Sequence, residues 1–206
     1  MLKRLQTWLP ELLWAALIFL LPITSLPLVA RLAGGSMVAP PALLPALLLA
    51  GFWLLPRLLQ HGGLPRQSLP LIWWGMAALG SSLLAFFIYI PPFREVNRLT
   101  NSLSGLITLV IGLTFYLLAA TWPDSPEKLQ RLLRWLNWSA IPLLLWSVVQ
   151  SAAWEIFNDS YPEWMWAVQR QISASGALYN WRTTGLAYEP SWLGHQLSML
   201  YLPWWL

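Results

Sequence analysis

Long apolar stretches, separated by short polar connections, dominate this sequence. Runs such as LLWAALIFLL at 12–21 and LITLVIGLTFYLLAA at 106–120 contain no charged residue. A helix that crosses a bilayer needs about 20 mainly apolar residues, because each residue adds about 1.5 Å along the helix axis. The sequence therefore predicts an all-α, polytopic transmembrane helix bundle with about six spanning helices. The expected spans are roughly 11–30, 38–56, 69–90, 103–121, 137–157 and 188–206.

The composition is that of a chain solvated by lipid. Only 10% of its residues are charged, against about 25% in an average soluble domain. The sixteen tryptophans suit a protein whose indole rings rest at the headgroup boundary. With no cysteine and only two histidines, the chain offers no thiolate zinc site, and we predict neither a metal nor a cofactor. The basic residues are scattered singly between apolar runs, which argues against a nucleic-acid partner.

The distribution of basic residues predicts a cytoplasmic N-terminus. When lysines and arginines are assigned to alternate sides, seven of the twelve fall on the side of the N-terminus. Cytoplasmic connections carry the excess of such residues, so we expect a multi-pass protein of the inner or plasma membrane. Lys3 and Arg4 precede the first apolar run, as in a signal peptide. That run is too long for a signal and contains Pro22 and Pro27, so we expect it to be retained as an anchor.

Two connections are predicted to contain helices that lie on the membrane surface. At 125–136, Ser125 can cap a helix, Pro126 suits its first position and Glu127 complements its positive end. The leucines that follow fall on one face, which predicts an interfacial helix on the inner side. The connection at 158–184 is the longest, and we expect it to be an outer loop with a short interfacial helix that breaks near Ser173 and Gly176.

The stretch that carries chemistry is RTTGLAYEPSWLGHQL at 182–197. Glu189 precedes a proline, so its backbone should be extended and a helix should begin at Pro190. The arginine fork of Arg182 suits phosphate oxygens, and a carboxylate at a helix entrance can orient a hydroxyl or accept its proton. Arg182 is therefore a candidate substrate-binding residue and Glu189 a candidate catalytic residue. Equally, the two side chains could simply pair with one another and fix the loop to the helix.

Further polar residues near the outer side are weaker candidates. Ser191, His195 and Ser198 form one stripe on the last helix, which we expect to face the bundle interior or to line a cavity. Alternatively, His195 is a buried, hydrogen-bonded packing residue. Arg94 and Arg98 could help to bind an anionic lipid-linked substrate, although such arginines often only solvate a loop. His61, in the QHGGLPRQ turn, is interpreted as a loop residue.

At this stretch the chain resembles the O-antigen ligase and polymerase superfamily. The resemblance is carried by Arg182, Gly185, Leu186, Glu189, Pro190 and Ser191 in RTTGLAYEPSWLG, and by proline-punctuated helices such as PITSLP at 22–27. It implies an enzyme that transfers a glycan from an undecaprenyl-diphosphate carrier to a glycan or lipid acceptor on the outer face of the membrane. It further implies that Arg182 contacts the diphosphate and that no metal or nucleotide is needed.

The resemblance covers about the first half of the family fold, which has roughly twice as many spanning helices. The chain 1–206 is accordingly expected to be a single membrane domain, the N-terminal fragment of a roughly twelve-helix protein and inactive alone. The family's later outer loop, with its histidine and second arginine, has no counterpart here, and His195 lies too early to replace that histidine. Two other functions remain open: half of a transporter or channel whose path the polar stripe lines, and a non-catalytic membrane scaffold.

Overall fold

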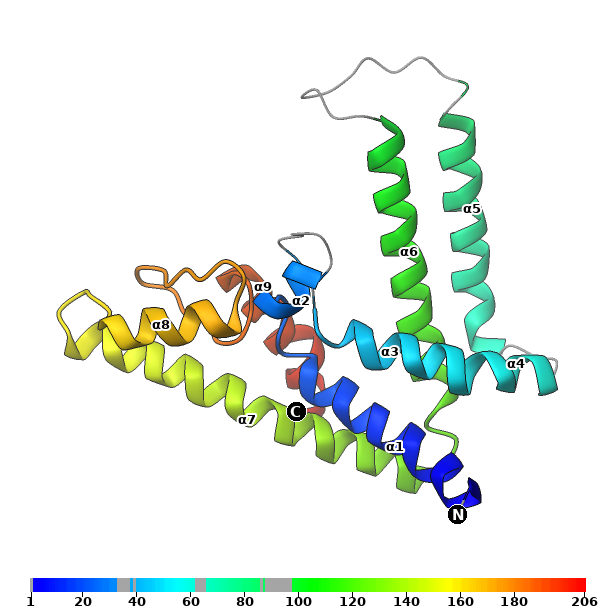
Figure 1. Cartoon of the computed structure of the whole chain (residues 1–206), viewed down its shortest axis with the longest axis horizontal. Helices are drawn as coiled ribbons and strands as arrows, with labels where there is room; N and C mark the ends of the chain where they lie inside the picture. Colours follow the sequence, from blue (N-terminus) through cyan, green and yellow to red (C-terminus); the bar gives the residue numbers. More distant parts are fainter. Residues whose placement is uncertain (1, 33–37, 39, 62–65, 86, 88–97) are drawn as a thin grey trace. The chain divides into compact units, whose positions relative to one another are not determined.

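The computed structural model describes residues 2–32, 38, 40–61, 66–85, 87 and 98–206 (Figure 1). Every regular element in these ranges is a helix, apart from one isolated β-bridge between Tyr179 and Arg182. The predicted all-α class is confirmed for this part of the chain. The elements are α1 (Leu2–Leu20), α2 (Pro27–Leu32), α3 (Leu43–Leu49), η1 (Ala50–Leu54), α4 (Leu55–His61), η2 (Arg66–Ser68), α5 (Leu69–Ala85), α6 (Arg98–Thr121), α7 (Pro126–Ile156), α8 (Glu163–Ile172), α9 (Pro190–His195), η3 (Gln196–Tyr201) and α10 (Leu202–Trp205).

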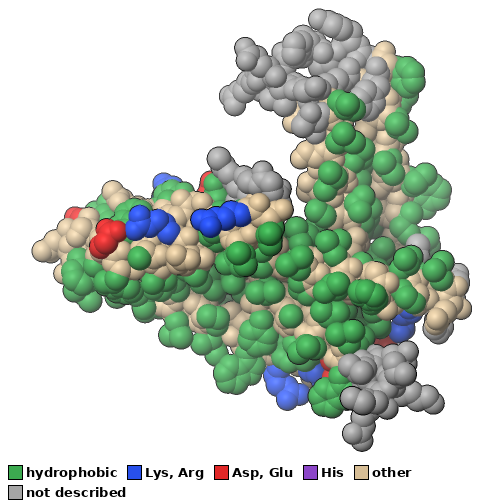
Figure 2. All heavy atoms as spheres, in the orientation of Figure 1, with side chains coloured by type: hydrophobic (Ala, Val, Ile, Leu, Met, Phe, Trp, Pro, Cys, Tyr) green, Lys and Arg blue, Asp and Glu red, His purple; other side chains and the backbone are tan. Residues whose placement is uncertain are grey.

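The helices have the length and surface of membrane segments. Within the described ranges, three helical runs are long and apolar enough to cross a bilayer: Leu43–Gln60, Asn101–Thr121 and Pro126–Ile156. Trp8–Leu20 and Leu69–Ala85 are apolar but shorter. Figure 2 shows hydrophobic side chains over much of the visible surface, an arrangement that water would penalise and lipid would solvate. The chain is thus a helical membrane protein, while six spans and a cytoplasmic N-terminus stay predictions.

The chain divides into two compact units. Unit 1 comprises Met1–Leu47 and Ser125–Leu206, and unit 2 comprises Leu48–Asp124. In unit 1, α1 packs along α7, α2 against α8, and η3 against α7. In unit 2, α5 and α6 pack side by side (Figure 1). The end of α6 is fixed by an edge-to-face contact between Trp53 and Trp122 and by an ion pair of 3.9 Å between Arg57 and Asp124.

Helix α7 begins where the sequence predicted but is longer than expected. Ser125 has an extended backbone, and its hydroxyl accepts a hydrogen bond from the Lys128 amide at 3.3 Å. The helix then continues without a break for 31 residues, about 46 Å at 1.5 Å per residue. The expected break between an interfacial helix at 125–136 and a span at 137–157 is therefore absent. Placement of 125–136 on the inner membrane surface stays a prediction. No glycine or proline separates the two segments, and Pro142 is accommodated inside the helix.

One face of α7 is buried at the centre of the packing in unit 1. Its buried residues recur at intervals of three, four and seven, the spacing of a single helical face. They are Leu136, Ser139, Ala140, Leu143, Gln150, Ala153 and Trp154. This periodicity runs through Pro142, which explains why the helix packs as one element. Near its start, Arg131 donates to the carboxylate of Glu11 on α1 and links the two helices.

The PITSLP segment ends the first helix instead of lying inside a span. The expected span at 11–30 was wrong in extent, because α1 stops at Leu20 and α2 begins only at Pro27. A proline at 22 cannot donate the amide hydrogen that would continue the helix. The carbonyls of Leu21 and Pro22, left without helical partners, accept hydrogen bonds from the Gln196 amide nitrogen at 3.2 and 3.1 Å.

The same break holds the loop that precedes α9. The Thr24 hydroxyl accepts a hydrogen bond from the Tyr188 amide at 2.7 Å, and the Ser25 carbonyl accepts one from the Ala174 amide at 3.0 Å. Two points of a distant loop are thus fixed by this segment, one by a side-chain hydroxyl and one by a backbone carbonyl.

Replacing Thr24 with valine should destabilise unit 1, because an isosteric side chain leaves the Tyr188 amide without this acceptor. The hydrogen bond is part-buried, and a typical one contributes about 0.5–1.5 kcal/mol. We expect a lower melting temperature for the purified Thr24→Val protein, measured by size-exclusion profiles after heating. Thr24→Ser keeps the hydroxyl and serves as the matched control. Equal melting temperatures for the two variants would show that this hydrogen bond contributes nothing.

Candidate functional site

The loop at 173–189, between α8 and α9, carries the predicted site residues. The helix expected within 158–184 is confirmed as α8, which ends at Ile172, and the backbone becomes extended at Ser173. Gly176, with a φ of 58°, then turns the chain. The predicted helix start at Pro190 is also confirmed, with Glu189 extended at φ −140° and ψ 157°. Placement of α8 on the outer membrane surface stays a prediction.

A buried amide on α7 holds the loop in place. The Gln150 side chain is 1% exposed, and its carbonyl oxygen accepts hydrogen bonds from the backbone amides of Thr184 and Gly185 at 2.9 and 3.0 Å. Its amide nitrogen donates to Gln169 on α8 at 3.1 Å and to the Thr184 hydroxyl at 3.2 Å. Trp146 also donates to Gln169, at 2.9 Å. This network joins α7, α8 and the loop inside the protein.

Gly185 allows the loop to approach α7 this closely. Its φ of 54° lies in the left-handed region that favours glycine. A Cβ atom at this position would lie 2.6 Å from the Ser147 hydroxyl and 2.9 Å from a Leu143 methyl group. The glycine is thus required both by backbone conformation and by space.

The two main candidates, Arg182 and Glu189, flank the part of the loop that Gln150 and Thr24 hold in place. Arg182 is exposed, and within the described residues its guanidinium has no carboxylate within 4.0 Å. Glu189 is half-buried, and its carboxylate accepts a hydrogen bond of 3.5 Å from the Ser191 hydroxyl. The alternative that Arg182 and Glu189 pair to fix the loop is therefore not what this part of the structure contains. The Gln150 network performs that role.

The polar stripe on the last helix lies on the outside of unit 1. Ser191, His195 and Ser198 are all exposed, whereas Leu193 and Tyr201 form the buried face. The His195 ring nitrogen lies 3.1 Å from the Ser191 carbonyl, and the Ser198 hydroxyl donates to the Gly194 carbonyl at 2.8 Å. A buried packing role for His195 was wrong, because its side chain is exposed in unit 1. That the stripe lines a cavity stays a prediction. Short polar side chains can satisfy themselves on their own helix.

The remaining candidates cannot be placed beside Arg182. Arg94 lies outside the described residues, and so does the side chain of Arg98, whose backbone begins α6 in unit 2. His61 ends α4, also in unit 2, and its side chain is likewise outside the described set. A shared anion-binding surface of Arg182, Arg94 and Arg98 stays a prediction.

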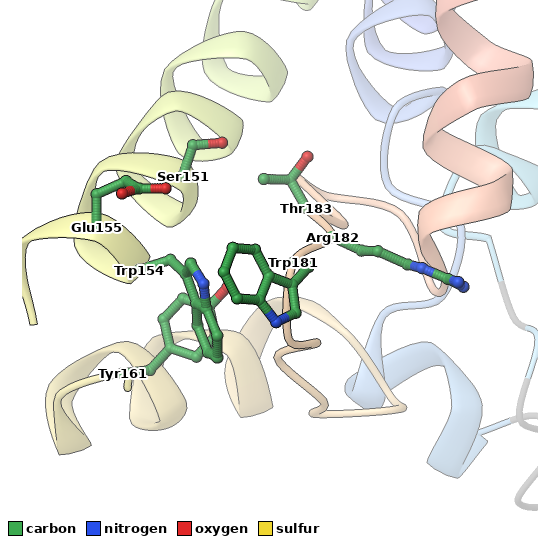
Figure 3. Close-up of a pocket in the computed structure, with 7 residues that line it drawn as sticks. All are labelled: Ser151, Trp154, Glu155, Tyr161, Trp181, Arg182 and Thr183. Atoms are coloured by element: carbon green, nitrogen blue, oxygen red, sulfur yellow. The ribbon is translucent and has the colours of Figure 1, made fainter. Parts of the chain in front are cut away.

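An aromatic pocket beside Arg182 was missed by sequence reasoning. It has a volume of about 230 Å³ and lies between the end of α7 and the loop, with Trp154, Glu155, Tyr161 and Trp181 among its lining residues. Figure 3 shows the three rings gathered together, while the guanidinium of Arg182 points away from them. Tyr161 and Trp181 lie at opposite ends of the connection at 158–184. The sequence could have indicated that these rings meet only if they lay on one face of a single predicted helix, and they do not.

Burial also affects the chemistry of this aromatic group. The Tyr161 hydroxyl donates to the Tyr179 carbonyl at 3.0 Å, and desolvation raises the pKa of Tyr161 above its ordinary value. The phenol therefore stays protonated at neutral pH and acts as a donor. No group of three or more metal-ligating side chains occurs in the described ranges.

No family model, curated protein or solved structure matches this chain. A family assignment and an activity are therefore argued from the residues and from the resemblance alone.

Replacing Gly185 with alanine should destabilise unit 1 by about 2 kcal/mol or more, because a left-handed alanine is strained and its Cβ meets α7. The measurement is thermal stability of the purified protein. Gly194→Ala is the matched control: this glycine lies in α9 with open space around it, and the substitution should leave stability unchanged or slightly improved. Equal stability of the Gly185→Ala protein and the wild type would contradict the close approach.

Proposed function

We propose that this chain takes part in transferring a lipid-linked glycan to an acceptor on the outer face of the membrane, as an O-antigen ligase or polymerase does. The observation that carries the proposal is Arg182, an exposed guanidinium without a carboxylate partner among the described residues, on a loop fixed by a buried amide. By contrast, Arg170 on α8 pairs with Glu163 at 2.8 Å. A fixed, unneutralised arginine fork is suited to bind two phosphate oxygens.

In the proposed reaction Arg182 binds the diphosphate of the undecaprenyl carrier and stabilises the charge that develops as it leaves. The acceptor hydroxyl attacks the anomeric carbon of the glycan and forms the new glycosidic bond. The bond from that carbon to the phosphate oxygen breaks, and its electron pair stays on the diphosphate. The Glu189 carboxylate accepts the proton of the acceptor hydroxyl. Arg94 and Arg98 would add positive charge to the same anionic substrate.

The competing functions have less support. A transporter or channel half requires a polar path, yet in unit 1 the groups of His195 and Ser198 are exposed and bonded to their own helix. A non-catalytic scaffold would leave the unpaired arginine and the fixed loop without a purpose. Measurements on Arg182 variants separate these functions from glycan transfer.

Arg182→Ala should reduce glycan transfer by about 100-fold or more, because removing one positioned donor from developing charge has an effect of that order. The measurement is the amount of polymer attached to its acceptor, in cells that make the protein from its own gene. Arg182→Lys keeps the charge but not the fork and should recover only part of the activity.

Arg170→Ala is the matched control for these variants, since it removes an exposed arginine that is already paired; transfer should remain near the wild-type level. Normal transfer by a stably inserted Arg182→Ala protein would exclude the proposed role of the arginine. Equal losses for both alanine variants would point to general destabilisation and would also count against it.

The proposal requires the loop at 173–189 to face outward. Because the chain has no cysteine, single cysteines can report the topology of α7 against a blank background. We expect Ser160→Cys to react with a membrane-impermeant maleimide in spheroplasts, and Gln130→Cys to react only after the membrane is permeabilised. The opposite pattern would place the loop in the cytoplasm and rule out transfer on the outer face.

A further inference from the structure

We propose that the aromatic pocket of unit 1, formed by Trp154, Glu155, Tyr161 and Trp181, binds one sugar residue of a glycan. Sugar binding is inferred from the geometry of the pocket alone. That the sugar belongs to the transferred glycan rests on the proposed function. Arg182 contributes to the wall of the pocket, although its guanidinium points away from the rings (Figure 3). This arrangement would allow one loop to contact a sugar on one side and a charged group on the other.

The walls of the pocket are aromatic faces and edges. Trp154 contacts Trp181 edge to face, with ring centroids 5.6 Å apart, and contacts Tyr161 at 5.2 Å. Sugars present apolar C–H faces as well as hydroxyl groups, and such faces stack on aromatic rings of this kind. The volume of about 230 Å³ is below the 300–1,000 Å³ range of sites for drug-sized ligands, which fits a single ring.

The backbone of Trp181 has a left-handed conformation, which favours glycine. Its φ of 61° lies in the left-handed region, where a bulky side chain is a marked outlier. The ring is 75% exposed, so burial contributes little to compensate for the backbone strain. The turn is fixed by the bridge between Tyr179 and Arg182 on either side of it. Strain of this kind is concentrated at sites where ligands bind.

The neighbouring indole carries a hydrogen-bond donor without an acceptor. Trp154 is 6% exposed, and its Nε1 is buried with no hydrogen-bond partner among the described residues. A buried unsatisfied donor is costly and is uncommon in a native protein. The rings of Tyr161 and Trp181 pack on this indole, and Trp181 is the more exposed of the two. A sugar hydroxyl entering beneath it would supply the acceptor.

Polar groups at the edge of the pocket complement this donor. The Glu155 carboxylate accepts hydrogen bonds, and the hydroxyls of Ser151 and Thr183, which line the same pocket, both donate and accept. Aromatic walls with a nearby carboxylate could also attract a quaternary ammonium ion. Such a cation has no acceptor for the Trp154 N–H, whereas a sugar satisfies the rings, the carboxylate and the donor together.

The test is saccharide binding to the purified full chain in lipid nanodiscs, without sugar-headed detergents. The probes are the methyl glycosides of glucose, galactose, rhamnose and N-acetylglucosamine, titrated by saturation-transfer NMR, with choline chloride as the cation probe. We expect at least one glycoside to bind and choline not to bind. Trp154→Phe, which keeps a ring but removes the N–H, should weaken that binding by about 5-fold or more, the loss expected for one hydrogen bond.

Trp181→Gly separates binding from folding. Glycine suits the left-handed backbone, so the variant should keep its melting temperature while losing glycoside binding by 10-fold or more. Trp138→Ala is the matched control, because Trp138 is another exposed tryptophan, 61% exposed on α7 and outside the pocket; its binding should be unchanged. Trp181→Phe keeps an aromatic ring and should retain most of the binding.

Several outcomes would overturn the inference: no glycoside binding to the wild type, binding of choline alone, or equal affinities for the wild type and Trp181→Gly. These results would leave the dependence of transfer on Arg182 untouched. Conversely, glycoside binding together with normal transfer by Arg182→Ala would support the sugar site and reject the proposed role of the arginine. The two proposals therefore fail separately.

Discussion

The hydrogen bonds of the buried Gln150 side chain are the interactions on which the rest of unit 1 depends. With Ser139, Gln150 is one of two polar residues on the buried face of α7, and it uses both ends of its amide. The carbonyl oxygen accepts hydrogen bonds from two backbone amides of the loop. The amide nitrogen donates to Gln169 on α8 and to the Thr184 hydroxyl. In a buried, low-dielectric setting such bonds are strong when complete and costly when broken. One amide therefore positions the loop that carries both candidate sites.

The second anchor of the loop comes from the other end of the sequence. The prolines of PITSLP stop α1 and leave backbone and hydroxyl groups free to bind elsewhere, and Thr24 and Ser25 use them to hold Tyr188 and Ala174. The loop is thus fixed at its beginning, middle and end. Its remaining side chains, notably Trp181 and Arg182, project from a rigid frame. Rigid support of exposed groups is what a binding site requires.

Several features of this frame could be predicted from the sequence. The start of α7 after Ser125 and the start of α9 at Pro190 follow from capping and proline rules that act within a few residues. The existence of α8 follows from an interfacial helix pattern. The expected break between 136 and 137 was wrong, because an amphipathic pattern and an apolar pattern can share one helix. The buried role of His195 was wrong for a related reason: periodicity identifies residues on one face but does not say what that face meets.

The sequence by itself determined the solvent of this protein and the class of its fold. Apolar runs of this length, with so few charges, form helices in lipid because every backbone amide must be satisfied within the segment. Local chemistry also determined where several helices begin. Only the tertiary structure decided that Gln150 holds the loop, that Gly185 must lack a side chain, and that Trp154, Tyr161 and Trp181 form one pocket. These residues are brought together by contacts between segments distant along the chain, and no rule of local spacing encodes them.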